Sequence, residues 1–148
     1  MPPRAAKAKG APLATLTKAF EFSASHRYHR PQWSDEENRR VFGACANPNG
    51  HGHNYMLEVT LTGPIDPVTG MIINLVDVKA VVEQVLEEFD HKHLNKDTPY
   101  FRDRIPTTEN LAITLWERIA PQLPPGPILH NLRLHEDEDL YADYRGGA

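Results

Sequence analysis

Cysteine is nearly absent from this chain, which has a single one, Cys45, among 148 residues. One cysteine excludes an internal disulfide and fits a reducing compartment, so we expect a cytoplasmic protein. No stretch approaches the roughly 20 consecutive apolar residues that a membrane-spanning helix needs. No apolar segment follows the first positive charges either, which argues against a secretory signal.

A strong excess of positive charge is also missing. Lys and Arg number 16 against 20 Asp and Glu, for a formal net charge of −4. This balance argues against a nucleic-acid or membrane-surface partner. Residues 1–12 are basic and lack large apolar side chains, so we expect a disordered tail there. The remainder, 13–145, is long enough for one domain around one core.

Histidine, by contrast, is abundant, with eight in the chain. His51 and His53 are two residues apart, and side chains two apart on a strand point to the same face. If residues 51–61 form a strand, that face continues with apolar residues, namely Tyr55, Leu57, Val59 and Leu61. The two histidines therefore end a row that faces the core.

A second row of the same design precedes it. Within 13–26, Phe20, Phe22 and Ala24 alternate with polar residues, and the row ends at His26. If the two strands pair, three imidazoles come together, which suits a catalytic zinc with one open coordination position. Spacing alone does not name the metal. Two alternatives stay open: ordinary strand histidines, or a structural site that Cys45 completes as fourth ligand.

The remaining patterns predict helices and two further strands. Ser34 and Asn74 are typical N-cap residues, and apolar residues recur at three- and four-residue steps over 74–89 and again after Thr107. Residues 128–136 and 140–144 alternate as strands do. We predict an α+β fold, with a four-stranded antiparallel sheet and two helices on one face. Free strand edges and a partly apolar second face favour assembly.

Five motifs, in order along the chain, resemble the 6-pyruvoyl-tetrahydropterin synthase family, and the resemblance runs from about Leu16 to Tyr144. They are Phe22-Ser-Ala-Ser-His26, Cys45-x5-His51-Gly-His53, Ile65-Asp-Pro-x-Thr-Gly70, Asp90-His91-Lys92 and Pro106-Thr-Thr-Glu-Asn110. The resemblance implies the tunnelling fold (T-fold), in which subunits join their sheets into a barrel. It further implies a homohexamer, a dimer of trimers, with sites between subunits, so that Thr107–Glu109 would serve a neighbour's metal centre.

The resemblance also implies a role for individual residues. It places a zinc ion on His26, His51 and His53, and an acid/base relay on Cys45, Asp90 and His91. Substrate-binding residues would be Glu136, which anchors the pterin, and Thr107, Thr108 and Glu109, which lie against its ring. Asp137 departs from the family, which usually has threonine there.

By the same resemblance, the chain would convert 7,8-dihydroneopterin triphosphate to 6-pyruvoyl-tetrahydropterin with loss of triphosphate, in tetrahydrobiopterin-type biosynthesis. The nearest rival is 6-carboxy-tetrahydropterin synthase of queuosine and deazaguanine synthesis, whose bacterial members tend to have fewer residues between the cysteine and His-x-His. Here five residues, Ala46 to Gly50, separate them, which favours the pyruvoyl enzyme. A rival of another class is a non-catalytic zinc-stabilised binding module, which would unfold when the metal is removed.

Overall fold

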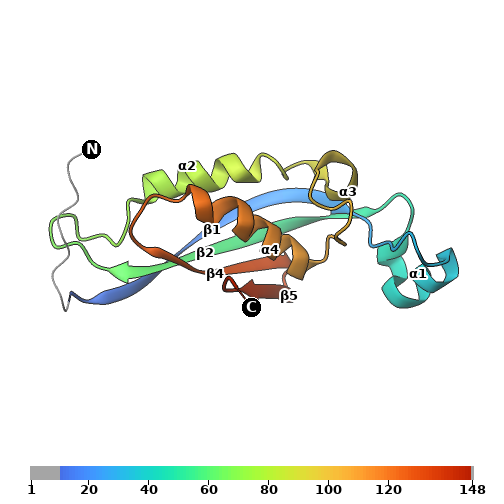
Figure 1. The fold of residues 1–148 in the computed structure, drawn as a ribbon, viewed down its shortest axis with the longest axis horizontal. Coiled ribbons are helices and arrows are strands. Elements are labelled where there is room, and N and C mark those ends of the chain that lie inside the picture. Colours follow the sequence, from blue (N-terminus) through green and yellow to red (C-terminus); the bar gives the residue numbers. More distant parts are fainter. Residues whose placement is uncertain (1–10, 148) are drawn as a thin grey trace.

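The computed structural model describes residues 11–147, which form a mixed sheet with helices on one side (Figure 1). The sheet contains β1 (Leu13–His26), β2 (His51–Pro64), β3 (Lys92–His93), β4 (Ile128–Asp137) and β5 (Leu140–Tyr144). Their order across the sheet is β3-β1-β2-β4-β5. The expected disordered tail, 1–12, lies outside the described residues except for its last two.

The long antiparallel pair β1–β2 dominates the sheet. Its register runs from Leu13 opposite Pro64 to His26 opposite His51 without interruption. Alternating apolar residues favour this pairing because each strand has one face to bury. The predicted strands over 13–26, 51–61, 128–136 and 140–144 are all present, with β2 and β4 extending slightly further.

The prediction of four antiparallel strands is wrong, because the described sheet has five. The additional strand, β3, contains only Lys92 and His93 and pairs in parallel with Ala24 and Ser25 of β1. A strand of two residues has no alternation that a sequence pattern can reveal. It follows His91, whose φ of 59° turns the chain back toward β1.

The helices begin where their capping residues predict. Helices α1 (Asp35–Phe42), α2 (Leu75–Leu86) and α4 (Thr108–Ile119) have Ser34, Asn74 and Thr107 as N-caps, and each cap side chain accepts a backbone N–H bond. One-turn helix α3 (Leu94–Asp97) and two 3₁₀ turns, Gly43–Ala46 and Ala120–Gln122, complete the list. α2 ends at Leu86, before the predicted Phe89, because Glu88 and Phe89 form tighter i to i−3 bonds.

The core lies between the sheet and helices α2 and α4, which cover the same face (Figure 1). Tyr55, Leu57, Val59 and Leu61 of β2 are buried there, as the alternation predicts. They pack with the apolar stripes of both helices in one cluster, which includes Val82 and Leu115. The histidine ends of β1 and β2 continue this buried row, so the core fixes the direction of their side chains.

The opposite face of the sheet is mixed, because exposed Ile128 and Tyr141 lie there among polar cross-strand pairs, in agreement with the expected partly apolar second face. Cross-strand pairs occupy it, including Thr17 with Thr60, Ser23 with Asn54, Arg133 with Asp143, and His135 with Glu58. Such pairs satisfy the hydrogen-bonding groups of these side chains where the face meets water.

The outer edge of β1 is largely free. Strand β3 covers only Ala24 and Ser25, so Leu13–Phe22 has no strand partner on that side among residues 11–147. Free backbone N–H and C=O groups along a long edge favour pairing with another chain. Within the same residues, every helix is too short or too polar to pass through a lipid bilayer.

Candidate metal centre

Three histidines meet at the end of the β1–β2 pair, as the sequence predicts. His26 comes from the last position of β1, and His51 and His53 from the start of β2. One ligand nitrogen of each lies within 4.8 Å of the others, and the described residues contain no other such group of His, Cys, Asp or Glu. The three nitrogens could hold one ion if the rings move inward, because zinc–nitrogen bonds are about 2.0–2.1 Å long.

The hydrogen bonding of His26 suits a metal ligand. The Tyr55 hydroxyl lies 2.9 Å from Nδ1 of His26 and fixes the ring. Nε2 of the same ring is buried without a hydrogen-bond partner in the described part of the chain, and it faces the other two histidines. Burial first, and then repulsion from His53, His51 and His93, lowers the pKa of His26 to about 3. The imidazole is therefore neutral at pH 7, as metal binding requires.

A buried carboxylate stands beside the histidines. Glu136 of β4 is 8% exposed, and its Oε1 lies 3.0 Å from Nε2 of His53 and 3.5 Å from Nε2 of His26. Neither nitrogen forms a hydrogen bond to it. Oε2 accepts a hydrogen bond of 3.0 Å from the Thr108 hydroxyl at the start of α4. The strand pattern predicted this position, since Leu132, Leu134 and Glu136 alternate toward the buried face.

Cys45 lies next to this group without belonging to it. Its Sγ is 3.9 Å from Nε2 of His51, and the cluster of possible ligands contains only the histidines. This geometry favours three nitrogen ligands over a structural site that Cys45 closes. Burial, and secondly the charge of Glu136, raises the pKa of the Cys45 thiol. The chain alone thus keeps the sulfur protonated, and a thiolate here requires a bound cation.

Two tyrosines complete the walls of the site and were not predicted as site residues. Tyr28 packs on His26 with ring centroids 4.8 Å apart, and Tyr55 bonds to it. Burial, followed by the charge of Glu136, raises the pKa of both phenols, so both stay protonated donors. Tyr28 lies two residues after His26, and Tyr55 lies two residues after His53. This two-residue spacing was the signal that could have identified them.

Asp90 and His91 lie elsewhere. Oδ1 of Asp90 accepts a bond from the Ser23 backbone N–H and lies 2.9 Å from Nδ1 of His91. The Ser23 bond is the main reason why the pKa of Asp90 is lowered. The His91 side chain is 83% exposed, and no contact joins it to Cys45 within residues 11–147. The expected pairing of aspartate and histidine is therefore present, but away from the cysteine in this chain.

Of the three residues expected against the pterin ring, Thr108 is the one that hydrogen-bonds to a residue of the site. Thr107 caps α4 through its hydroxyl, which accepts the Asn110 N–H, and Glu109 is exposed. Thr108 bonds to Glu136 of its own chain, and the expectation that Thr107–Glu109 serves a neighbour's centre stays a prediction.

Burial of neutral His26 predicts a dependence of stability on pH in the metal-free protein. Folded His26 titrates near 3, against 6.5 for an ordinary histidine, so the unfolded chain binds an extra proton between these values. Stability contributed by His26 is complete above pH 6.5 and is lost as the pH falls toward 3. The loss is at most about 1.4 kcal/mol per pH unit.

Urea unfolding at pH 7 and pH 5 measures this loss. We expect His26→Gln to flatten the dependence, whereas His130→Gln, a histidine exposed on β4, should retain the wild-type slope. Equal slopes in wild type and His26→Gln would show that His26 is not held neutral by folding.

Comparison with known proteins places these features in one family. The family model for 6-pyruvoyl tetrahydropterin synthase matches residues 15–147. The 6-pyruvoyl tetrahydrobiopterin synthase of Poecilia reticulata is 49% identical over 135 residues, covering 90% of this chain and 91% of the relative. An archaeal protein from Archaeoglobus fulgidus named as a putative 6-carboxy-5,6,7,8-tetrahydropterin synthase is 33% identical, over 64% of this chain and 75% of its own length.

A solved structure agrees with the sequence comparison. The 6-pyruvoyl tetrahydropterin synthase of Caenorhabditis elegans superposes with a TM-score of 0.89 at 36% identity, covering 93% of this chain and 98% of that one. The fold is therefore that of these synthases, as predicted. With a matching family model over nearly all of its length and a metal-binding group of three histidines, the chain belongs to the 6-pyruvoyl tetrahydropterin synthase family.

Proposed function

We propose that this protein is a zinc-dependent 6-pyruvoyl-tetrahydropterin synthase, which converts 7,8-dihydroneopterin triphosphate to 6-pyruvoyl-tetrahydropterin and triphosphate. The observation that carries the proposal is the group formed by His26, His51 and His53 beside buried Glu136. In this arrangement one substrate can contact the metal ion through its side chain and Glu136 through its pterin ring. The reaction takes place in the cytoplasm, where the free thiol of Cys45 stays reduced.

Glu136 anchors the pterin in this proposal. Its carboxylate is nearly buried, and Thr108 holds one oxygen in a fixed direction. A carboxylate accepts two parallel hydrogen bonds from the adjacent N–H groups of a pterin ring, and such charge-assisted bonds are strong where water is excluded. The bond to Thr108 therefore orients the anchor before the substrate arrives.

Cys45 accepts the proton that the substrate side chain loses. Zinc on the three histidines, when bound, supplies Lewis acidity toward the side-chain hydroxyl oxygens and a positive charge beside the thiol. That charge opposes the burial and the Glu136 carboxylate that otherwise raise the pKa of Cys45. The sulfur, 3.9 Å from a ring nitrogen of His51, lies close enough to feel it.

His91 returns protons, and we place it in the site of a neighbouring subunit. Asp90 orients its ring, and the imidazole is exposed at the surface of its own chain, in an open pocket that Gly52 and His53 also line. The free edge of β1 beside it offers a surface for sheet pairing between chains. A homohexamer arranged as a dimer of trimers brings His91 of one subunit to Cys45 of another.

Product identification tests the proposal. Zinc-loaded protein incubated with dihydroneopterin triphosphate should release triphosphate and a product with the mass of 6-pyruvoyl-tetrahydropterin. Cys45→Ala should retain stoichiometric zinc while kcat falls by about 10²–10⁴, as expected for a lost general base. Release of 6-carboxy-tetrahydropterin would contradict the assignment, and loss of zinc in Cys45→Ala would make the cysteine a ligand.

Subunit mixing tests the shared site. Cys45→Ala and His91→Asn are each expected to be inactive, but hybrid oligomers of the two contain pockets with both residues intact. Random mixing at equal amounts should restore roughly a quarter of the wild-type sites.

The matched control mixes Cys45→Ala with Glu136→Gln. Because Cys45 and Glu136 lie in the same chain's pocket, this pair should restore nothing. If hybrids of Cys45→Ala and His91→Asn form by mass and stay as inactive as the control, the relay does not cross a subunit boundary.

A further inference from the structure

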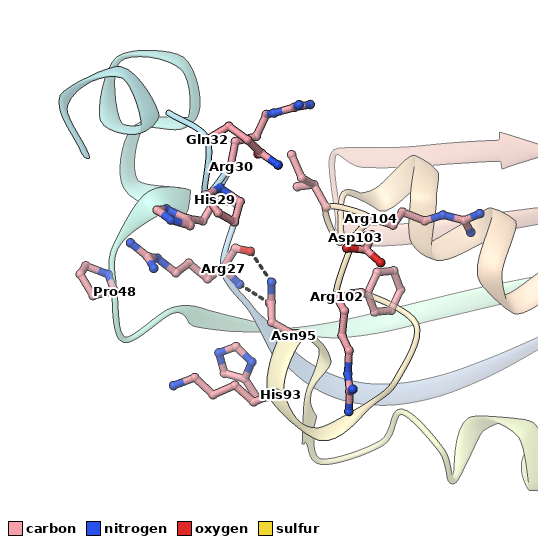
Figure 2. Close-up of a pocket in the computed structure, with 14 residues that line it drawn as sticks. Arg27, His29, Arg30, Gln32, Pro48, His93, Asn95, Arg102, Asp103 and Arg104 are labelled. Carbon is pink, nitrogen blue, oxygen red and sulfur yellow. Dashed lines mark hydrogen bonds between the residues drawn. The ribbon is translucent and has the colours of Figure 1, made fainter. Parts of the chain in front are cut away.

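A cationic pocket lies beside the metal centre. It has a volume of about 500 Å³ and lies between segment 27–32, the start of α3 and the loop 101–105. Arg27, Arg30, Lys96 and Arg102 line it, and Asp103 is its single acidic lining residue. Figure 2 shows Arg27 and His29 on one side of the pocket and the loop with Arg102 on the other. This excess of positive charge is unusual in a chain of net charge −4.

These lining cations are mostly not neutralised by the chain. Arg104, which also lines the pocket, turns away and contacts Thr114 and Glu117 (Figure 2). By contrast, no ion pair within residues 11–147 involves Arg27, Arg30 or Arg102. Unpaired cations around one concave surface concentrate a positive field there, which favours a multivalent anion.

Two asparagines hold the cationic segment in place. Asn95 of α3 bonds to both the N–H and the C=O of Arg27, at 2.8 and 2.9 Å (Figure 2). Buried Asn38 of α1 does the same for Arg30, at 2.7 and 3.0 Å. The backbone of both arginines is thus fixed from two sides. With the backbone already ordered, only the side chains lose conformational entropy when an anion binds.

Residues of the pocket are neighbours in sequence of residues at the metal centre. Arg27 follows His26 directly, and the loop that ends at Ile105 leads into Thr107 and Thr108. Gly50 lies against both sites, since an added Cβ would come within 2.7 Å of the His26 carbonyl oxygen and 3.2 Å of Nε2 of His93. Both ring nitrogens of His93, which lines the pocket, lack a hydrogen-bond partner among residues 11–147.

We propose that this pocket binds the triphosphate group of the substrate, with Arg27, Arg30, Lys96 and Arg102 as the cations that contact it. The proposal rests on the function proposed above, which requires a substrate with a pterin at one end and a triphosphate at the other. Glu136 holds the first end in a nearly buried site, and the pocket receives the second. The side chain between them then lies at the histidines, where the chemistry occurs.

The pocket also has a consequence for the elimination step. When the C–O bond to the triphosphate breaks, the electron pair leaves with the phosphate oxygen and negative charge accumulates on the leaving group. Arginine is well suited to this charge, because its planar fork donates two hydrogen bonds to one phosphate. The same cations should bind free triphosphate as product, so inorganic tripolyphosphate is expected to compete with the substrate.

Titration calorimetry with inorganic tripolyphosphate tests the pocket without turnover. We expect zinc-loaded protein to bind it, and Arg30→Gln and Arg102→Gln each to weaken binding about tenfold, as for the loss of one charge-assisted contact. Both side chains are exposed, so their replacement should leave the fold intact. Because tripolyphosphate chelates zinc, the zinc content of the protein is measured after each titration.

Arg39→Gln is the matched control, since it removes an exposed arginine on α1 that does not line the pocket. It should bind tripolyphosphate like wild type, and phosphate-free dihydroneopterin should bind all variants equally. Unchanged tripolyphosphate binding in both pocket variants would overturn the proposal, as would equal weakening in Arg39→Gln. A protein that binds tripolyphosphate in this pocket but does not turn over the substrate would refute the proposed reaction and leave the pocket standing.

Discussion

The pairing of β1 with β2 in one uninterrupted register is the constraint on which the site depends. That register sets His26 opposite His51, with His53 two residues further along the same face. If either strand slipped by one residue, its histidines would point to the opposite face of the sheet. The apolar rows that precede the histidines are buried against α2 and α4, so the free energy of core formation also fixes the metal ligands.

Burial places neutral imidazoles and a carboxylate close together. Neutral His26 and the Oε1 atom of Glu136 are 3.5 Å apart, with no hydrogen bond between them. A group of buried nitrogen lone pairs facing a carboxylate is costly without a cation, because none of these atoms has its full set of partners. The arrangement is therefore suited to a bound metal ion and to a pterin that donates hydrogen bonds to Glu136.

Much of the site could be predicted from the sequence because it lies on strands with period-two alternation. His26, His51, His53 and Glu136 each end an apolar row, and each reaches the place that its row indicates. The two-residue strand β3 has no such pattern and was missed. The cationic pocket was not predictable from spacing either, since its residues come from separate segments that only the fold brings together.

The sequence also did not predict which side of the molecule Asp90 and His91 would face, because they lie outside any alternating strand. Their motif follows a helix end, where a positive φ at His91 turns the backbone toward β1. In the described chain this ring is 83% exposed and pairs with Asp90, while Cys45 lies beside His51, so no strand pattern links the two parts of the proposed relay.

X-ray absorption at the zinc edge of the zinc-loaded protein tests the central claim most directly. Three imidazoles with an open position predict only nitrogen and oxygen neighbours, at about 2.0–2.1 Å, in wild type and unchanged in Cys45→Ser. A sulfur neighbour at about 2.3 Å in wild type that disappears in Cys45→Ser would contradict it, because Cys45 would then be a ligand and not a base.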